Sequence, residues 1–312
     1  MQRVFMFPGQ GSQSVGMLAE LAAQESVVTA TFAEASAALG YDLWELVQQG
    51  PAERLADTVV QQPAMLVAGI ATWRYWLARG GQRPDAVCGH SLGEFSALTA
   101  AGALELATAV TLVRRRAELM QEAAPAGVGA IAAVLGLEDE AVADACQEAA
   151  QGEVVELVNF NSHGQVVIAG HAAAVQRAQE GCKSRGAKRA LLLPMSVPAH
   201  SSLMRPAAER FGAELSRAKL TAPSLAYWSP VDAAAHATPE DILALMTRQL
   251  ASPVRWTDLV RALVAAGTTT FVECGPGKVL TGLTRRIEKR PDIQCMALQD
   301  PGSVEAALGA AT

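Results

Sequence analysis

The chain has 312 residues, of which 50% are apolar and 18% are charged, and its net charge is −6. This length accommodates one large domain and a smaller one, and the composition is that of a soluble globular protein. The negative charge argues against nucleic acid as the main ligand, and no apolar run is long enough to cross a membrane. The five scattered cysteines lack CxxC spacing and the first residues carry no signal-peptide pattern, so we expect a cytoplasmic protein with reduced thiols.

The first predicted strand is Arg3–Phe7, and a glycine-rich loop follows it at residues 8–13. The loop does not complete the GxGxxG spacing, which argues against a dinucleotide site. Small residues at the C-terminal end of a strand are nevertheless where α/β proteins bind ligands. Gln10 can therefore place its backbone N–H in such a site.

A long helix is predicted over residues 64–78, because Pro63 suits a first helical turn and apolar side chains run almost all round the helix. Gly80 and Gly81 end it, and a short apolar run over residues 86–88 follows. The next residues, Gly89-His90-Ser91-Leu92-Gly93, match Gly-x-Ser-x-Gly and lead into a helix-compatible run. A strand, a sharp turn and a helix are the context of a nucleophile elbow. Side chains at the two glycines would collide with the neighbouring strand and helix, so we expect Ser91 to be a nucleophile on a strained turn.

The predicted helix over residues 104–122 places an arginine on its apolar side. Leu112, Val113 and Met120 lie three or four positions from Arg116, so this guanidinium shares their face. A buried guanidinium is costly unless it meets an anion. From the residues alone, a buried ion pair with a protein carboxylate and a clamp for a substrate carboxylate are equally good interpretations.

Residues 126–196 are predicted to form a strand, a helix, two strands, a helix and a strand, in that order. A polar loop at residues 159–164 lies between the two inner strands. This βαββαβ order is typical of a ferredoxin-like unit. We therefore predict an α/β fold with an α/β-hydrolase-like large domain, containing a parallel sheet and the elbow, at residues 1–125 and 197–312. A small ferredoxin-like domain at residues 126–196 is inserted into it. Its basic second helix and last strand are interpreted first as a solvated face and second as a phosphate-binding rim.

His200 is the strongest candidate for the base that Ser91 needs. It precedes two serines that can cap a following helix, and such a loop position faces a cleft. The acids between Ser91 and His200 fall mostly in the small domain, so a hydrolase triad lacks its third member. An amide or a backbone carbonyl can orient the imidazole instead. The residues alone thus predict a serine acyltransferase or hydrolase, with a carboxylate-bearing acyl group if Arg116 is a clamp.

The chain resembles the malonyl-CoA:acyl-carrier-protein transacylases, and especially the stand-alone bacterial enzymes of type II fatty-acid synthesis. The resemblance runs from about residue 3 to about residue 300. The motifs that carry it, in chain order, are FPGQGSQ at residues 7–13, QPA at residues 62–64, GHSLGE at residues 89–94, Arg116, the His200 loop and GPGK at residues 275–278.

The resemblance implies a ping-pong transfer, in which Ser91 takes malonyl from coenzyme A and passes it to the phosphopantetheine thiol of acyl carrier protein. It implies His200 as base and acid, the backbone N–H groups of Gln10 and Leu92 as the oxyanion hole, Arg116 on the malonyl carboxylate, and Gln249 holding the histidine. Further coenzyme A contacts are expected at Asn161, Gln165, Lys188 and Arg189. No cofactor or metal is expected, since malonyl-CoA is a substrate, and neither is nucleic acid or a membrane. We expect a monomer.

The chain departs from the family pattern at Trp228-Ser229-Pro230, where relatives tend to have an asparagine. Whether this loop makes a polar contact to the site is therefore left open by the sequence. Ala199 occupies a position that often varies with the acyl group. Three alternatives remain. The first is a transferase that serves a polyketide synthase or malonate decarboxylase carrier protein. The second is a serine esterase or thioesterase, and the third is a non-catalytic module that docks a carrier protein.

Overall fold

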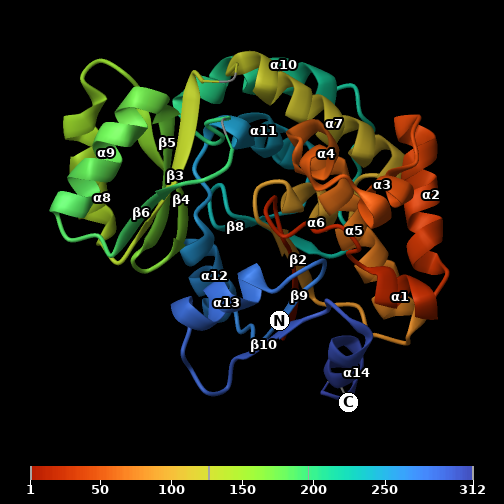
Figure 1. The fold of residues 1–312 in the computed structure, drawn as a ribbon. Helices are drawn as coiled ribbons and strands as arrows, with labels where there is room; N and C mark the ends of the chain where they lie inside the picture. The colour runs from red at the N-terminus through yellow and green to blue at the C-terminus, as the bar shows by residue number, and fades with distance from the viewer. Residues whose placement is uncertain (1, 126, 196, 311–312) are drawn as a thin grey trace.

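Two β-sheets organise the chain (Figure 1). One cluster of buried apolar side chains belongs to the smaller sheet and its helices, whereas another joins residues of both sheets. The computed structural model describes residues 2–125, 127–195 and 197–310. The two end residues of the predicted small domain, Ala126 and Ser196, lie outside the described residues. Helices combine with a mostly parallel larger sheet, which confirms the predicted α/β class.

The larger sheet has six strands in the order β10-β9-β1-β2-β7-β8. All neighbouring pairs are parallel except β7 and β8, which are antiparallel. The strands are β1 (Arg3–Phe7), β2 (Ala86–Gly89), β7 (Ala226–Ser229), β8 (Ala234–His236), β9 (Thr270–Glu273) and β10 (Gln294–Ala297). Because β1 and β2 are neighbours in the middle of the sheet, the loops that follow them meet at its C-terminal edge.

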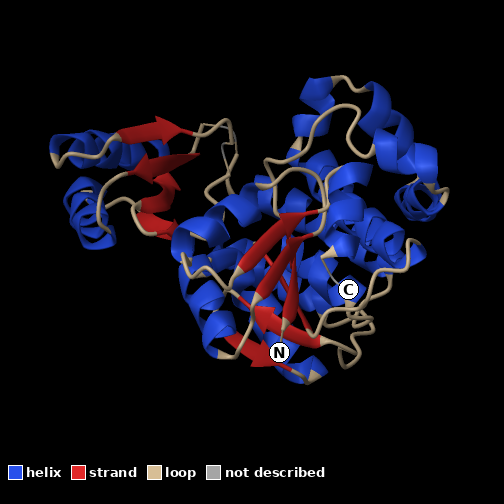
Figure 2. Ribbon diagram, turned by 90° about the horizontal axis from the view of Figure 1, so that it is seen from below, coloured by secondary structure: helices blue, strands red, loops and turns tan. Residues whose placement is uncertain are grey.

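Helices cover both faces of this sheet, as Figure 2 shows. Side chains alternate along β1: Phe5 and Phe7 enter one core, whereas Val4 and Met6 enter the other. The helices and helical turns of this unit are α1 (Ala19–Gln24), α2 (Val27–Leu39), α3 (Leu43–Gln49), α4 (Ala52–Ala56), α5 (Thr58–Ala78), α6 (Gly93–Ala100), α7 (Leu106–Ala123), η1 (Ser202–Met204), α10 (Arg205–Leu215), α11 (Pro239–Arg248), η2 (Gln249–Ala251), α12 (Trp256–Ala265), α13 (Val279–Ile287) and α14 (Pro301–Gly309).

The start of α5 corrects the sequence prediction. The helix begins at Thr58, and Pro63 lies inside it rather than in its first turn. The side chain of Asp57 accepts a hydrogen bond from the backbone N–H of Val59, which caps the earlier start. The helix tolerates Pro63 because nearly every residue around it is buried, so packing outweighs one lost backbone hydrogen bond.

The smaller sheet has four strands in the order β4-β5-β3-β6, and its neighbouring pairs are antiparallel. In chain order its elements are β3 (Gly129–Leu135), α8 (Asp139–Ala150), β4 (Val155–Ser162), β5 (Gln165–His171), α9 (Ala172–Ser184) and β6 (Arg189–Leu192). The predicted polar loop at residues 159–164 is shorter than expected, because β4 continues to Ser162 and only two residues separate it from β5. Asn161 therefore lies on a strand.

The two units are joined along β4. The backbone N–H of Phe160 donates to the carbonyl of Val254, and Glu156 accepts hydrogen bonds from the backbone N–H and hydroxyl of Ser202. Ser202 therefore bonds the small unit instead of capping a helix as predicted, and the hydroxyl of Ser201 donates to the carbonyl of Pro198. Across the described residues, no helix combines the length and apolar character that crossing a membrane requires.

The glycines around Ser91 permit a close approach of backbone segments. A Cβ at Gly93 would lie 2.0 Å from the carbonyl oxygen of Phe7, and one at Gly89 would lie 2.0 Å from the carbonyl carbon of Gly93. The predicted collision is thus confirmed. Without side chains at these positions, α6 starts directly above the end of β2.

We predict that Gly93→Ala lowers the free energy of unfolding by at least about 2 kcal/mol, because the new methyl overlaps a backbone carbonyl that cannot move without distorting β1. The matched control is Gly282→Ala in the middle of α13, where a Cβ meets nothing within 4 Å. It should stabilise the protein by about 0.5–1 kcal/mol. Denaturant unfolding of both variants measures this, and equal stabilities would contradict the clash.

Candidate active site

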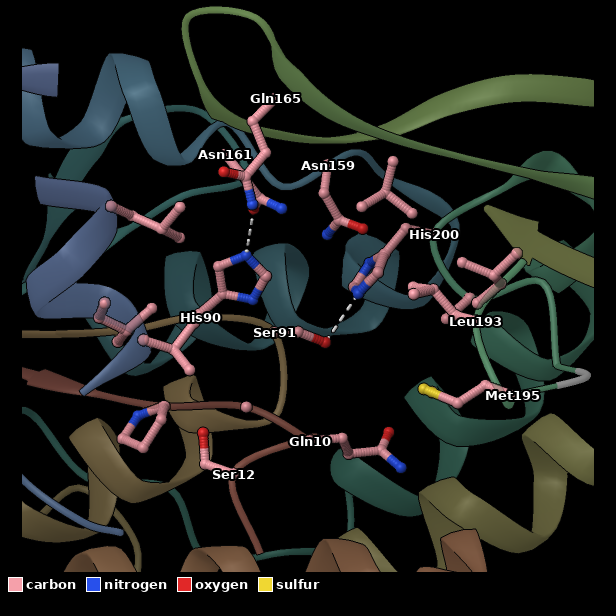
Figure 3. A pocket seen from close by; sticks show the side chains of 18 residues that line it. Gln10, Ser12, His90, Ser91, Asn159, Asn161, Gln165, Leu193, Met195 and His200 are labelled. Atoms are coloured by element: carbon pink, nitrogen blue, oxygen red, sulfur yellow. Dashed lines mark hydrogen bonds between the residues drawn. The ribbon is translucent and has the colours of Figure 1, made fainter. Parts of the chain in front are cut away.

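A pocket opens between the two units, at the C-terminal edge of the larger sheet (Figure 3). The loops after β1 and β2 contribute Gln10, His90 and Ser91. The small unit contributes polar side chains from β4 and β5, and α13 contributes apolar ones. A reactive hydroxyl, polar groups and an apolar wall thus converge in one cleft, as is typical of a small-molecule site.

Ser91 occupies the predicted elbow. Its φ is +54°, a left-handed backbone conformation that costs energy for any residue with a Cβ. The turn between β2 and α6 imposes this conformation and holds the side chain in the pocket. Its hydroxyl Oγ lies 2.7 Å from Nε2 of His200, which is 109 residues further along the chain (Figure 3).

The imidazole of His200 is oriented by backbone carbonyls. Its Nδ1 lies 3.0 Å from the carbonyl oxygens of both Gln249 and Ser252. Carbonyl oxygens only accept hydrogen bonds, so Nδ1 carries the proton and Nε2 is left to accept from the Ser91 hydroxyl. No carboxylate contacts this imidazole within residues 2–125, 127–195 and 197–310. Gln249 thus orients His200 through its backbone and not through its side chain.

The protonation state of His200 suits a general base. Burial and, after it, the positive charge of Arg116 lower the pKa of His200 to about 3. The imidazole is therefore neutral at neutral pH and can take a proton from Ser91 without first losing one.

Arg116 is fully buried behind Ser91 and does not itself form the pocket wall. Its Nη1 donates to the amide oxygen of Gln62 at 2.8 Å, and its Nη2 lies 3.1 Å from the amide oxygen of Gln249 and 3.2 Å from Oγ of Ser91. Its Nε has no hydrogen-bond partner among the residues that the structure describes. The structure therefore does not show the direct ion pair that was one of the two interpretations of this residue.

The charge of Arg116 persists even though its direct partners are neutral. Burial lowers the pKa of Arg116 to about 10, which leaves the guanidinium protonated at neutral pH. Neutral amide partners satisfy hydrogen bonds without cancelling the charge. The arrangement suits the binding of an anion close to Ser91.

The side chain of Gln249 connects the guanidinium to a buried carboxylate. Its amide nitrogen donates to the backbone carbonyl of Ser91 at 2.8 Å and to Oε1 of Glu94 at 2.7 Å. Oε2 of Glu94 accepts hydrogen bonds from the hydroxyls of Tyr227 and Ser229, at 2.5 and 2.6 Å. The Trp228-Ser229-Pro230 segment, which departs from the family pattern, thus does make a polar contact. The contact runs from Ser229 to Glu94.

Gln62 and Glu94 are site residues that the sequence reasoning missed. Both lie on helices among apolar neighbours, and a buried polar side chain on an apolar face is the signal that could have indicated them. Gln62 precedes Pro63, which was interpreted as a helix start, and Glu94 directly follows the elbow motif. Their partners are more than 50 residues away, so no local pattern shows what they contact.

The two residues predicted for the oxyanion hole flank Ser91. Gln10 lines the pocket, and its side-chain amide bonds Gln61 and Gln62. Leu92 is buried and directly precedes α6, where backbone N–H groups are free of helical partners. The role of their N–H groups stays a prediction.

The four predicted coenzyme contacts divide into two pairs. Asn161 and Gln165 line the pocket, and Asn161 Oδ1 lies 2.9 Å from Nε2 of His90, which Figure 3 shows turned toward it. Lys188 and Arg189 are exposed outside the pocket lining. Burial lowers the pKa of His90, so this pocket residue is a neutral polar group.

Comparison with known proteins adds the family to this geometry. The acyl transferase domain model matches residues 4–309. The chain belongs to the acyl transferase domain family. The malonyl CoA-acyl carrier protein transacylase of Escherichia coli strain K12 is 53% identical over 98% of this chain and 99% of the relative, and that of Bacillus subtilis is 43% identical over 97% and 95%.

Solved structures of this acyl transferase family share the fold throughout. An acyl carrier protein S-malonyltransferase from Vibrio cholerae superposes with a TM-score of 0.95 at 53% identity, covering 98% of this chain and all of the other. A malonyl-transacylase in complex with a type II polyketide acyl-carrier protein superposes with a TM-score of 0.97 at 48% identity, covering 99% and 100%.

We predict that His200 is neutral and carries its proton on Nδ1 at pH 6, because both neighbours of Nδ1 only accept hydrogen bonds and burial opposes the imidazolium. Nitrogen-15 NMR of labelled histidine distinguishes the two tautomers and follows protonation. The ring should resist protonation down to about pH 3. A titration between pH 6 and pH 7, or a proton on Nε2, would contradict the derived role.

Proposed function

We propose that this protein is a malonyl-CoA:acyl-carrier-protein transacylase that works through a malonyl ester on Ser91. One observation carries the mechanism: a single hydroxyl oxygen lies 2.7 Å from a neutral imidazole and 3.2 Å from a buried guanidinium. The imidazole suits proton transfer, and the guanidinium suits an acyl group that ends in a carboxylate. Relatives at 53% identity bear the name of this activity.

In the first half-reaction, Oγ of Ser91 attacks the thioester carbonyl while Nε2 of His200 takes the hydroxyl proton. The negative charge on the carbonyl oxygen is stabilised by the backbone N–H groups of Gln10 and Leu92. The carbon–sulfur bond then breaks, and His200 returns the proton to the departing coenzyme A sulfur. The carbonyls of Gln249 and Ser252 hold the imidazole in place through both transfers.

The second half-reaction runs the same steps in reverse order. The phosphopantetheine thiol of acyl carrier protein gives its proton to His200 and attacks the malonyl ester, and Ser91 recovers its proton as the ester bond breaks. A neutral imidazole is again the form required, which the low pKa of His200 provides. No cofactor is needed, because the dyad supplies both nucleophile and base.

Arg116 selects the acyl group. A malonyl group on Oγ of Ser91 extends only a few bonds to its carboxylate, and Nη2 of Arg116 is already 3.2 Å from Oγ. The unpartnered Nε gives the guanidinium a second donor for this carboxylate. Acyl groups without a carboxylate would leave the buried charge unmatched.

The mouth of the pocket suits coenzyme A and the acidic carrier protein. Asn161 and Gln165 line it, and Gln165 accepts a hydrogen bond of 2.5 Å from Arg286 of α13. Lys188 and Arg189 are exposed on the small unit. Two other basic residues, Arg185 and Arg290, pair with nearby acids. We therefore place the docking charge mainly on Lys188, Arg189 and Arg286.

The finer structural assignments belong to the same proposal. We assign an α/β-hydrolase-like large domain to residues 1–125 and 197–312 and an inserted ferredoxin-like domain to residues 126–196. The chain order β3-α8-β4-β5-α9-β6 supports the second assignment. We also propose a monomer, because one chain builds the site, and five buried unpaired cysteines fit a reducing cytoplasm.

A second carrier protein is supported by one comparison. A structural neighbour at 48% identity is a malonyl-transacylase bound to a type II polyketide carrier protein. The same dyad would serve either carrier. Transfer rates to carrier proteins from fatty-acid and polyketide systems, measured side by side with malonyl-CoA as donor, decide which one this enzyme prefers.

Malonyl-CoA alone should malonylate Ser91 and release one equivalent of coenzyme A, because the first half-reaction needs no carrier protein. Mass spectrometry of the peptide that contains Ser91 measures the adduct, and Ser91→Ala should remove it. Rapid appearance of free malonate without a detectable adduct would favour a serine hydrolase.

Arg116→Ala should lower kcat/KM for malonyl-CoA on the order of a hundredfold and raise the relative rate with acetyl-CoA, because the substrate carboxylate loses its buried partner. Arg115→Ala is the matched control. Arg115 is the adjacent residue of α7, but it pairs with Glu118 and Glu122 at the surface. Steady-state kinetics with both donors test this, and unchanged malonyl kinetics in Arg116→Ala would remove the clamp.

A further inference from the structure

Glu94 is a fully buried carboxylate to which the transfer mechanism gives no part. It lies in the first turn of α6, three residues after Ser91, and has no exposed surface. Its oxygens face different groups: Oε1 accepts from the side-chain amide of Gln249, and Oε2 accepts from Tyr227 and Ser229. A buried carboxylate held only by neutral donors needs a positive charge nearby.

Arg116 supplies that charge through one intervening side chain. The amide of Gln249 accepts from Nη2 of Arg116 at 3.1 Å and donates to Oε1 of Glu94 at 2.7 Å. The guanidinium and the carboxylate thus form a pair bridged by a neutral amide. The charge of Arg116 opposes the rise that burial causes in the pKa of Glu94.

The other titratable groups around Glu94 cannot take over its charge. Burial raises the pKa of Tyr227 on β7 and of Cys88 on β2, and the charge of Glu94 raises both further, so they stay neutral. Asp232 influences only Tyr227 among these groups. Glu94 is therefore the group in this cluster that can exchange a proton near neutral pH: burial raises its pKa to about 7, against the opposing effect of its hydrogen bonds and Arg116.

A substrate carboxylate would place a second anion on the same buried cation. Two carboxylates that share one site disfavour each other's ionisation. The malonyl carboxylate touches the guanidinium, whereas Glu94 reaches it only through Gln249, so Glu94 is the one expected to give up its charge. We propose that Glu94 takes up a proton from water when the malonyl carboxylate occupies Arg116, so that malonylation of Ser91 is coupled to protonation of this buried carboxylate. This inference rests on the proposed function.

Protonation of Glu94 requires only one hydroxyl hydrogen to turn, because Tyr227 and Ser229 both donate to Oε2 of the ionised carboxylate. A proton on Oε2 can be donated to the hydroxyl of Tyr227 or Ser229, because hydroxyls accept as well as donate. Oε1 then keeps its bond from Gln249, and Gln249 keeps its amide oxygen on Arg116. Glu94 thus acts as a positioning residue whose charge adjusts to the ligand of Arg116.

Proton uptake during acylation tests the inference. The hydroxyl proton of Ser91 ends on the coenzyme A thiol, so acylation itself neither consumes nor releases a proton at pH 7.5. We expect the protein, mixed with malonyl-CoA in weakly buffered indicator solution, to take up about half to one proton per malonylated Ser91. Acetyl-CoA, which brings no carboxylate, should give acylation without uptake.

Glu94→Gln preserves the shape of the side chain, and the proton uptake, counted per malonylated Ser91 whatever the rate of malonylation, should be lost. Glu273→Gln is the matched control, because Glu273 is also buried but accepts from the backbone of α13 and not from the Gln249 bridge. It should retain the uptake. Ser229→Ala removes one donor to Glu94, which raises the pKa of this carboxyl further and should move the uptake to higher pH.

Mass spectrometry of the same samples measures malonylation of Ser91, and this distinguishes a failure of the inference about Glu94 from a failure of the proposed function. Malonylation without proton uptake in the unaltered protein, or uptake retained in Glu94→Gln, would overturn this inference and leave the transacylase standing. Uptake of the same size with acetyl-CoA would also overturn it. Absence of malonylation would overturn the proposed function and the inference together.

Discussion

The site depends on a single hydroxyl oxygen that contacts two groups, one neutral and one positively charged. Oγ of Ser91 lies 2.7 Å from a neutral imidazole and 3.2 Å from a charged guanidinium. In the proposed mechanism, the imidazole removes the hydroxyl proton, and the guanidinium attracts the acyl group that replaces it. A left-handed backbone at Ser91 and another at His200, with φ of +54° and +68°, direct these side chains toward each other. Strain of this kind persists only where surrounding structure imposes it, as the close packing at Gly89 and Gly93 does.

The placement of charge lets the proposed dyad of Ser91 and His200 work without an acid. A carboxylate on His200 would favour the imidazolium, whereas carbonyl oxygens fix the tautomer and leave the ring neutral. Arg116 also disfavours the imidazolium from the other side of Ser91. The buried carboxylate of Glu94 is separated from the guanidinium by the amide of Gln249. The positive charge therefore stays available for a ligand.

Local patterns were enough to select Ser91, Arg116 and His200, which the structure brings together in one site. The elbow followed from two glycines around Ser91, Arg116 from its position on an apolar helix face, and His200 from its loop. The same reasoning started α5 six residues late, because Pro63 is a common helix start and only dense packing lets it sit inside one. It ended β4 too early, because the partner strand and the contact with Val254 that extend it are not visible in the segment itself.

The amino-acid sequence by itself determined the candidates Ser91, Arg116 and His200 and the order of most strands and helices, since glycine spacing and apolar periodicity act over a few residues. Only the tertiary structure decided what those residues contact. Gln62 and Gln249 reach Arg116 across 54 and 133 positions, and the amide of Gln249 reaches Ser91 across 158. Such contacts exist because two sheets and their helices pack into one shape, and no local preference specifies the distance between groups so far apart in the chain.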